Sequence, residues 1–141
     1  MRLNFKHLAL AVVFVFLTHF SASADEINWL DYKTGSKVSL ETDKKMYIYF
    51  FSAKCPWCVK MENDTFKNKK VAKYLNKNFT PVKVDVYKDQ NTAALYGIGP
   101  IPASIFMESD IKTGIYKRPG YIPSDTFIKI IETINLGKYK E

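Results

Sequence analysis

The only two cysteines of this 141-residue chain lie in the segment Cys55-Pro56-Trp57-Cys58, which follows the apolar run 46–51 after three intervening residues. This order places a pair of thiols at the junction between a strand and a helix. Residues three apart on the first turn of a helix share a face, so the second sulfur reaches the first and closes a small ring. The pair therefore predicts a redox site at a strand-to-helix turn.

The two sulfurs are expected to have different tasks. A helix N-terminus carries unpaired N–H groups and partial positive charge, which favour a thiolate over a thiol. Lys54 adds a cation beside the first cysteine. We therefore expect Cys55 to be the attacking thiolate and Cys58 to be the less exposed thiol that resolves the intermediate.

The start of the chain has the pattern of a cleaved export signal. Its first residues are basic, residues 8–20 are almost wholly apolar, and residues 22–24 (Ala-Ser-Ala) have the small side chains that signal peptidase recognises. The apolar run is shorter than the ~20 residues of a membrane-spanning helix. We predict a signal peptide over 1–24, a single mature domain over 25–141, a periplasmic or secreted location, and no stable membrane insertion after cleavage.

Export changes what the cysteines imply. A disulfide persists in the periplasm or outside the cell, so the pair need not be permanently reduced. Two cysteines make at most one bridge, which is too few for a disulfide-stapled mini-protein. The mature region is close to the usual domain size of ~100–150 residues and is long enough to build its own core.

The histidines provide an exclusion. His7 and His19 are the only two, and both lie in the predicted signal peptide. The mature domain would then have no imidazole, which excludes Cys–His nucleophilic schemes and zinc sites with mixed Cys and His ligands. We expect no metal site and no cofactor other than the Cys55–Cys58 disulfide itself.

The chain is basic. Loss of Arg2 and Lys6 with the signal peptide would lower the formal net charge from +7 to +5, because no acidic residue lies in that segment. A run of lysines follows the cysteine motif: Lys60, Lys67, Lys69, Lys70, Lys73 and Lys77. Such a run is more typical of a solvated helical face than of a docking patch for an acidic partner or an anionic membrane. Without a recognisable binding module, we expect no nucleic-acid partner.

The order of expected elements is that of an α/β domain. Residues 25–45 are expected to form a short helix or arm, and strands are expected over 46–52, 79–86, 103–107 and 115–118, the last two joined by a hairpin turn over 109–114. Helices are expected over 56–76 with a break near Asn68, over 90–96 up to Gly97, and from an N-cap at Ser124 to Gly137. The early alternation predicts parallel pairing with crossover helices, and the late hairpin adds an antiparallel edge.

Two separated motifs resemble the thioredoxin superfamily. One is the segment 50–58 (FFSAKCPWC), and the other is 96–106 (YGIGPIPASIF), which is similar to the family segment where an apolar residue precedes a cis-proline at the start of a strand. The similarity extends over about 45–136. It implies a thioredoxin-like α/β fold with a central mixed sheet of about four to five strands flanked by helices. The Cys-Pro-Trp-Cys-x-x-Met stretch ending at Met61 resembles exported thioredoxin-like proteins and the soluble domains of periplasmic electron carriers.

The resemblance implies a substrate-binding surface around the sulfurs. Pro102 would be the cis-proline that places its loop beside them. The backbone of Ile101 would pair with an extended substrate segment. Pro56 and Trp57, between the cysteines, would supply an apolar contact surface around the attacked disulfide.

The chain departs from the family pattern below the second cysteine. Thioredoxins usually carry a buried aspartate six residues before the first cysteine, and Tyr49 stands there. The lysine that accompanies this aspartate is expected to be replaced near Pro81. The proton acceptor for Cys58 is therefore open, with Asp85 and Glu62 as candidates, although both are more typical of surface or strand-end carboxylates.

The resemblance implies a thiol–disulfide oxidoreductase that reduces exported protein substrates and is re-reduced by a membrane thiol carrier. Pro56-Trp57 offers no histidine to stabilise the thiolate further, and Ile101 before the proline resembles the reducing branch of the superfamily. A disulfide oxidase or isomerase uses the same chemistry in other directions. Two further hypotheses are a non-catalytic binding module with Cys55–Cys58 as a structural disulfide, and a Cu(I) carrier that uses both thiolates.

Overall fold

The computed structural model describes residues 26–139. Four strands form one sheet in the order β2-β1-β3-β4, and their bounds are β1 Lys45–Phe51, β2 Phe79–Asp85, β3 Ala103–Met107 and β4 Gly114–Pro119. β1 and β2 run parallel, whereas the β1–β3 and β3–β4 pairs are antiparallel. Leu30 adds a single parallel bridge to Val82 at the β2 edge. The sheet is therefore mixed, as the resemblance implies.

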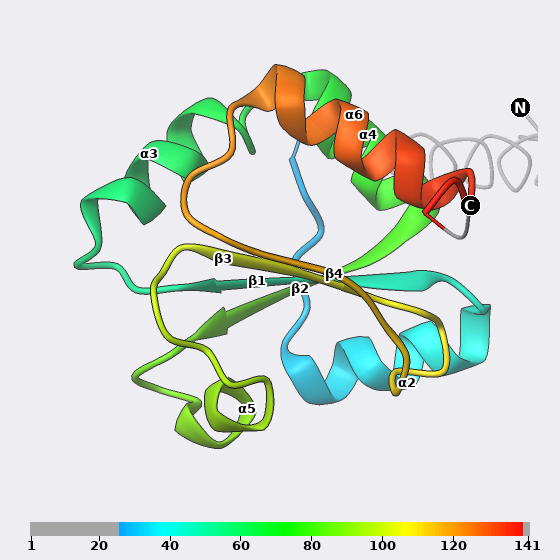
Figure 1. Cartoon of the computed structure of the whole chain (residues 1–141), viewed down its shortest axis with the longest axis horizontal. Coiled ribbons are helices and arrows are strands. Elements are labelled where there is room, and N and C mark those ends of the chain that lie inside the picture. Colours follow the sequence, from blue (N-terminus) through cyan, green and yellow to red (C-terminus); the bar gives the residue numbers. More distant parts are fainter. Residues whose placement is uncertain (1–25, 140–141) are drawn as a thin grey trace, which may run out of the picture.

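Helices cover both faces of this sheet. α2 (Tyr32–Thr42) and α5 (Gln90–Leu95) lie on one side, and α3 (Pro56–Asp64), α4 (Lys69–Asn78) and α6 (Ser124–Asn135) lie on the other (Figure 1). The expected α/β fold with a central mixed sheet flanked by helices is confirmed. Within residues 26–139, no helix has the length and apolarity needed to span a membrane. The predicted signal peptide over 1–24 lies outside the described residues.

Most element boundaries follow the local chemistry expected from the sequence. The predicted break in the second helix separates α3 from α4, and Asn68 caps α4 by accepting hydrogen bonds from the N–H groups of Lys70 and Val71. One predicted cap is wrong. Ser124 is the first helical residue of α6, and Pro123 occupies the cap position without a side-chain hydrogen bond. Pro123 has an extended backbone there, so the helix begins one residue earlier than a serine cap would allow.

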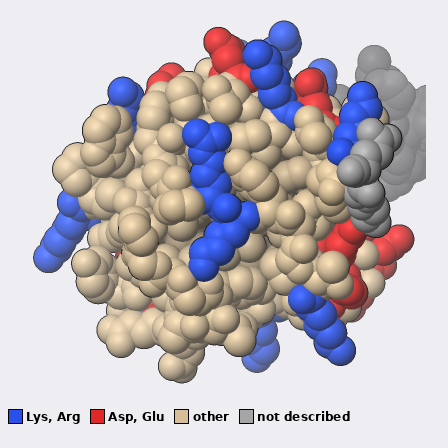
Figure 2. Space-filling model, in the orientation of Figure 1, with Lys and Arg blue, Asp and Glu red and all other residues tan. Residues whose placement is uncertain are grey.

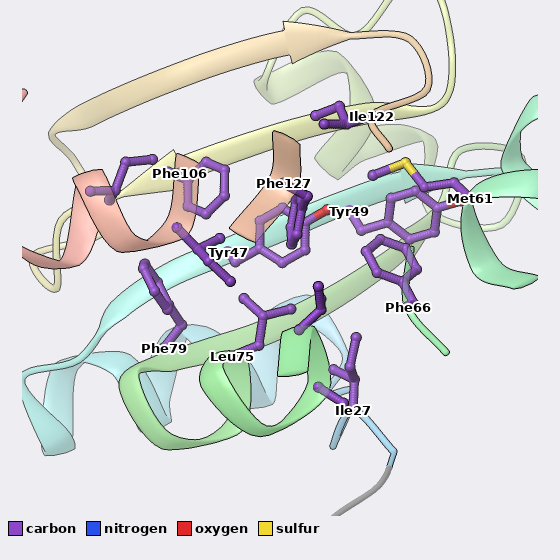
Figure 3. Close-up of a cluster of buried hydrophobic side chains, with 14 residues drawn as sticks. Ile27, Tyr47, Tyr49, Met61, Phe66, Leu75, Phe79, Phe106, Ile122 and Phe127 are labelled. Atoms are coloured by element: carbon purple, nitrogen blue, oxygen red, sulfur yellow. The ribbon is translucent and has the colours of Figure 1, made fainter. Parts of the chain in front are cut away.

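The core on the α3–α4–α6 side of the sheet is mainly aromatic. Tyr47 and Tyr49 project from β1 into the middle of this cluster, where Figure 3 shows them among Phe106, Phe127 and Phe66. Ring centroids lie 4.7 Å apart for Tyr47–Phe106 and also for Tyr49–Phe66. Aromatic rings bury a large apolar area each, so this cluster fixes β1 and the cysteine turn that follows it.

On the other face, α2 packs directly against β2 because Gly35 has no side chain. A Cβ atom at position 35 would lie 2.2 Å from Cγ2 of Val82, which is fully buried. Overpacking of this kind costs about 1–3 kcal/mol, against a gain of about 1 kcal/mol for alanine over glycine in a helix. The 2.2 Å contact places the cost near the upper end of that range, so we expect Gly35→Ala to lower the free energy of unfolding by about 2 kcal/mol in chemical denaturation. Val82→Ala in the same chain should recover part of this loss, and an unchanged denaturation midpoint for Gly35→Ala would contradict the packing argument.

Candidate active site

Cys55 lies at the turn from β1 into α3, where it is the N-cap residue of the helix. The carbonyl of Ser52 accepts a hydrogen bond from the Cys55 N–H at 3.1 Å, and the Ser52 hydroxyl accepts one from the Lys54 N–H at 3.2 Å. Pro56 occupies the first turn, where a missing N–H costs nothing. The Cys55 sulfur accepts a hydrogen bond from the Cys58 N–H at 3.3 Å. The sulfur therefore lies at the N-terminus of α3, with a backbone N–H directed at it.

The loop before β3 reaches the same sulfur. The peptide bond between Ile101 and Pro102 is cis, and the Cys55 thiol points at the Ile101 carbonyl oxygen, 3.7 Å away. Pro102 is buried and Ile101 is half-buried. Cys55 is also partly exposed, so an incoming disulfide has access to it. The structure therefore brings the two sequence motifs together, although they are about forty residues apart in the chain.

Cys58 has a different environment from Cys55. It is fully buried, and this burial, together with the neighbouring Cys55, raises its pKa to about 12. Hydrogen bonding by the Ser52 backbone opposes the rise in this pKa, and the Tyr49 hydroxyl opposes it to a smaller extent. The second thiol therefore stays protonated at neutral pH. It needs a proton acceptor before it can attack.

The prediction that the lysine accompanying the position of Tyr49 is replaced near Pro81 is wrong. The register of β1 and β2 pairs Tyr47 with Pro81 and Tyr49 with Lys83, so a lysine does stand opposite the tyrosine. The Tyr49 hydroxyl donates to the Cys58 carbonyl oxygen at 3.2 Å. Burial raises the pKa of Tyr49, and the charges of Cys58 and Glu62 raise it further.

Glu62 is the carboxylate whose charge acts on the buried Tyr49 hydroxyl. Glu62 follows Cys58 by one helical turn and pairs with Lys83, with 3.0 Å between its Oε1 and Nζ of the lysine. The two side chains are 36% and 25% exposed, so the pair borders both the core and solvent. Next to it lies a hollow of about 440 Å³, lined by Ile27, Trp29 and other residues. The other carboxylate candidate, Asp85, instead caps a turn by accepting from the Tyr87 N–H.

A surface beside the cysteines also contains two residues that sequence reasoning missed, Tyr121 and Asp64. Trp57 is 56% exposed, and its ring centroid lies 5.9 Å from that of Tyr121 in the loop after β4. The Lys60 ammonium stands over both rings, 5.2 Å and 4.7 Å from their centroids, and the Tyr121 hydroxyl donates to Asp64. No motif in the sequence signalled Tyr121, because its position depends on how the last loop folds back over α3.

Five of the six lysines predicted to form one solvated face are divided between three places. Lys60 covers the two rings, Lys67 borders the hollow near Glu62, and Lys70, Lys73 and Lys77 line a groove between α4 and α6. Over the face shown in Figure 2, Lys and Arg side chains are scattered among uncharged ones, with carboxylates at the top and right edges. Among residues 26–139, no three His, Cys, Asp or Glu side chains are grouped so as to hold a metal ion.

A dithiol at the first turn of a helix, next to a cis-proline loop and following a strand of a mixed sheet, defines a protein of the thioredoxin class. The comparison of sequences agrees. The chain belongs to the Thioredoxin-like domain family, whose sequence profile matches residues 32–135.

Two curated relatives have similar sequences. An uncharacterized protein from Archaeoglobus fulgidus is 31% identical over 83 residues, which is 59% of this chain and 64% of that protein. An uncharacterized protein from Caenorhabditis elegans is 31% identical over 108 residues, which is 66% of this chain and 15% of that protein. The chain thus spans less than two thirds of either relative, and neither assigns it an activity.

Solved structures show the same fold. A thioredoxin from Thermus thermophilus superposes with a TM-score of 0.70 at 20% identity, covering 77% of this chain and 87% of that one. The DsbH oxidoreductase gives 0.67 at 16% identity, over 79% and 85% of the two chains. A disulphide isomerase from Xylella fastidiosa gives 0.62 at 19% identity, over 77% and 97%. At these identities, the likeness shows a thioredoxin-like fold, which is typical of thiol–disulfide oxidoreductases.

Proposed function

We propose that this chain is an exported thiol–disulfide oxidoreductase that reduces disulfide bonds in other exported proteins. The observation that carries the proposal is the difference between the two sulfurs. Cys55 is partly exposed and accepts an N–H at a helix N-terminus, whereas Cys58 is buried and its pKa is raised to about 12. A nucleophile that faces solvent beside a shielded second thiol is what stepwise disulfide exchange requires.

In the first step, the Cys55 thiolate attacks one sulfur of the substrate disulfide. A bond forms between Cys55 and that sulfur, the substrate S–S bond breaks, and the other substrate sulfur leaves as a thiolate. In the second step, deprotonated Cys58 attacks the Cys55 sulfur and releases the first substrate sulfur. The substrate gains two electrons, and the Cys55–Cys58 disulfide that forms must be reduced again by a dithiol donor, for which we propose a membrane thiol carrier.

The proposed binding surface surrounds Cys55. Pro56 and Trp57 would contact apolar side chains next to the substrate disulfide, and the Ile101 backbone would pair with an extended segment of the substrate. Pro102 would hold this loop beside the sulfur. Support comes from the 3.7 Å approach of Cys55 to the Ile101 carbonyl and from the exposure of Trp57.

We propose that Glu62 accepts the proton of Cys58. A thiol with a pKa of about 12 is ionised in only about one molecule in 10⁵ at neutral pH, so an acceptor is needed for the second step. Glu62 shares a helix face with Cys58, its charge acts on the same tyrosine as Cys58, and the adjoining hollow connects it with solvent. The ammonium of Lys83, 3.0 Å from Oε1, orients this carboxylate.

The proposed activity is tested by insulin reduction with a dithiol donor, followed by turbidity, and by trapping in cells. Cys58→Ala retains the attacking sulfur but lacks the resolving one, so it should accumulate mixed disulfides through Cys55. Recovery of these adducts from the periplasm would identify the substrates. Adducts that form equally through Cys58 in a Cys55→Ala protein would contradict the assigned roles. The absence of insulin reduction by the wild-type protein would instead favour a non-catalytic binding module.

A Glu62→Gln variant tests the proton acceptor. We expect release of the substrate from its mixed disulfide to slow by about 10²-fold at neutral pH, because the amide accepts no proton. The rate in this variant should then climb about tenfold per pH unit, following ionisation of Cys58. Stopped-flow fluorescence of a labelled mixed disulfide measures both effects. Asp85→Asn is the matched control and should leave the rate unchanged; the opposite result for the two variants would assign the acceptor to Asp85.

Disulfide isomerisation is the second candidate, favoured by the structural likeness to the isomerase from Xylella fastidiosa. An isomerase attacks and leaves through Cys55 without net electron transfer, so it restores activity to a scrambled disulfide protein when no dithiol donor is added. A reductase needs the donor. The donor dependence of ribonuclease refolding therefore separates the two functions.

A further inference from the structure

We propose that the groove between α4 and α6 binds an acidic segment of a partner protein. The groove has a volume of about 610 Å³. Three of its lysines come from one face of α4 and the fourth, Lys129, comes from α6. The four positive charges therefore converge from two helices that are far apart in the sequence, which a solvated face of a single helix does not explain.

The floor of the groove is suited to a polypeptide. Tyr74 of α4 and Ile128 of α6, both partly buried, supply apolar surface between the lysines. The Tyr74 hydroxyl is held in place by a hydrogen bond that it accepts from Asn135 at 3.2 Å. Glu132 is the single carboxylate in the lining. Charge at the rim and apolar surface at the floor are the composition of a protein-binding groove.

Two of the α4 lysines in the groove have unfavourable positions in their own helix, whereas Lys77 lies in the last turn, where the dipole favours a cation. Lys70 lies in the first turn, where the helix dipole disfavours a cation, and α4 has no acidic residue in that turn. Lys73 and Lys77 are four residues apart, a spacing at which like charges repel. Within residues 26–139, none of the four groove lysines forms an ion pair. Local rules that are broken without an ion pair to offset them, as at Lys70 and at the Lys73–Lys77 spacing, are typical of functional sites.

The chemistry of the groove favours an acidic protein segment over an anionic bilayer. A flat membrane is best met by a convex surface with projecting apolar side chains, whereas this surface is concave. The large apolar residues that are highly exposed, such as Leu95 and Leu136, are not among the residues that line it. A segment with alternating carboxylate and apolar side chains would pair its carboxylates with the lysines at the rim. Its apolar side chains would pack on Tyr74 and Ile128 at the floor.

The test uses a fluorescein-labelled synthetic peptide of alternating Glu and Leu residues, a Gln-and-Leu peptide as its neutral counterpart, and vesicles of phosphatidylglycerol and phosphatidylcholine. We expect the acidic peptide to bind the mature protein in fluorescence anisotropy, more tightly at low ionic strength, and to shift amide NMR signals of α4 and α6. The variant Lys70→Ala/Lys73→Ala/Lys77→Ala should bind about tenfold more weakly. Lys129→Ala alone should also weaken binding, since this residue lies on the second helix of the groove.

A charge-matched control removes three exposed lysines elsewhere: Lys33→Ala/Lys88→Ala/Lys112→Ala. This variant should bind within about twofold of the wild type. The proposal is overturned if the control weakens binding as much as the groove variant, if Lys129→Ala has no effect, or if the vesicles bind through these lysines while the acidic peptide does not. Thermal denaturation provides an independent readout: the groove variant should be about as stable as the wild type, because removal of the unfavourable Lys70 charge and of the Lys73–Lys77 repulsion offsets the loss of the favourable Lys77 charge.

Discussion

A Cys55→Ser variant is expected to reduce insulin no faster than the dithiol donor alone, a loss of about 10³-fold or more relative to the wild type. Serine keeps the size of the side chain but is not ionised at neutral pH, so the nucleophile of the first step is removed. The Cys58 thiol does not replace it, because it is fully buried and its pKa is raised to about 12. Turbidity with a saturating donor measures the loss.

Cys58→Ser is the matched control for this prediction. It keeps the attacking sulfur and the helix turn, so we expect one equivalent of substrate thiol to be released rapidly and turnover to stop at the mixed disulfide. Quenched-flow mass spectrometry distinguishes the two variants, because only Cys58→Ser should gain the mass of the substrate. A Cys55→Ser protein that retains a tenth of the wild-type turnover would show that Cys58 can start the exchange, and the proposed asymmetry would be wrong.

The parts of the fold that were predictable depend on local patterns. The strands β1 and β2 and the helix α6 were predictable from the spacing of their apolar residues. This spacing shows which face is buried, and it can be recognised within a short window of sequence. The break between α3 and α4 was predictable for the same reason, since Asn68 caps its own helix. The prediction of Ser124 as the N-cap is wrong because Pro123 has the extended backbone that the N-cap position needs. It occupies that position without a side-chain hydrogen bond.

The parts of the site that were missed depend on contacts between distant elements. The residue opposite Tyr49 is Lys83, two positions beyond Pro81. This pairing depends on the register of β1 against β2, which the sequence of either strand alone does not give. Tyr121 reaches Trp57 only because the loop after β4 folds over α3. The division of the lysines likewise depends on the path of the chain between α3 and α6.

Tyr49→Ala is expected to lower the free energy of unfolding by about 3–5 kcal/mol. Tyr49 is fully buried, its ring centroid lies 4.7 Å from Phe66 and 5.6 Å from Phe51, and Figure 3 shows it between Met61 and the rest of the aromatic cluster. Alanine would leave a cavity directly beneath α3, next to the buried thiol. Urea denaturation followed by tryptophan fluorescence measures the loss.

Tyr49→Phe separates the ring from the hydroxyl. The phenylalanine keeps the packing, so the free energy of unfolding should fall by no more than about 1.5 kcal/mol. The hydroxyl no longer hydrogen bonds to Cys58, so the pKa of Cys58 should rise further. In a Cys55→Ser background, alkylation of Cys58 at mildly alkaline pH should therefore be slower in the Tyr49→Phe variant than in the protein that keeps Tyr49. If Tyr49→Phe instead costs as much stability as Tyr49→Ala, the hydroxyl, and not the aromatic packing, holds the second sulfur in place.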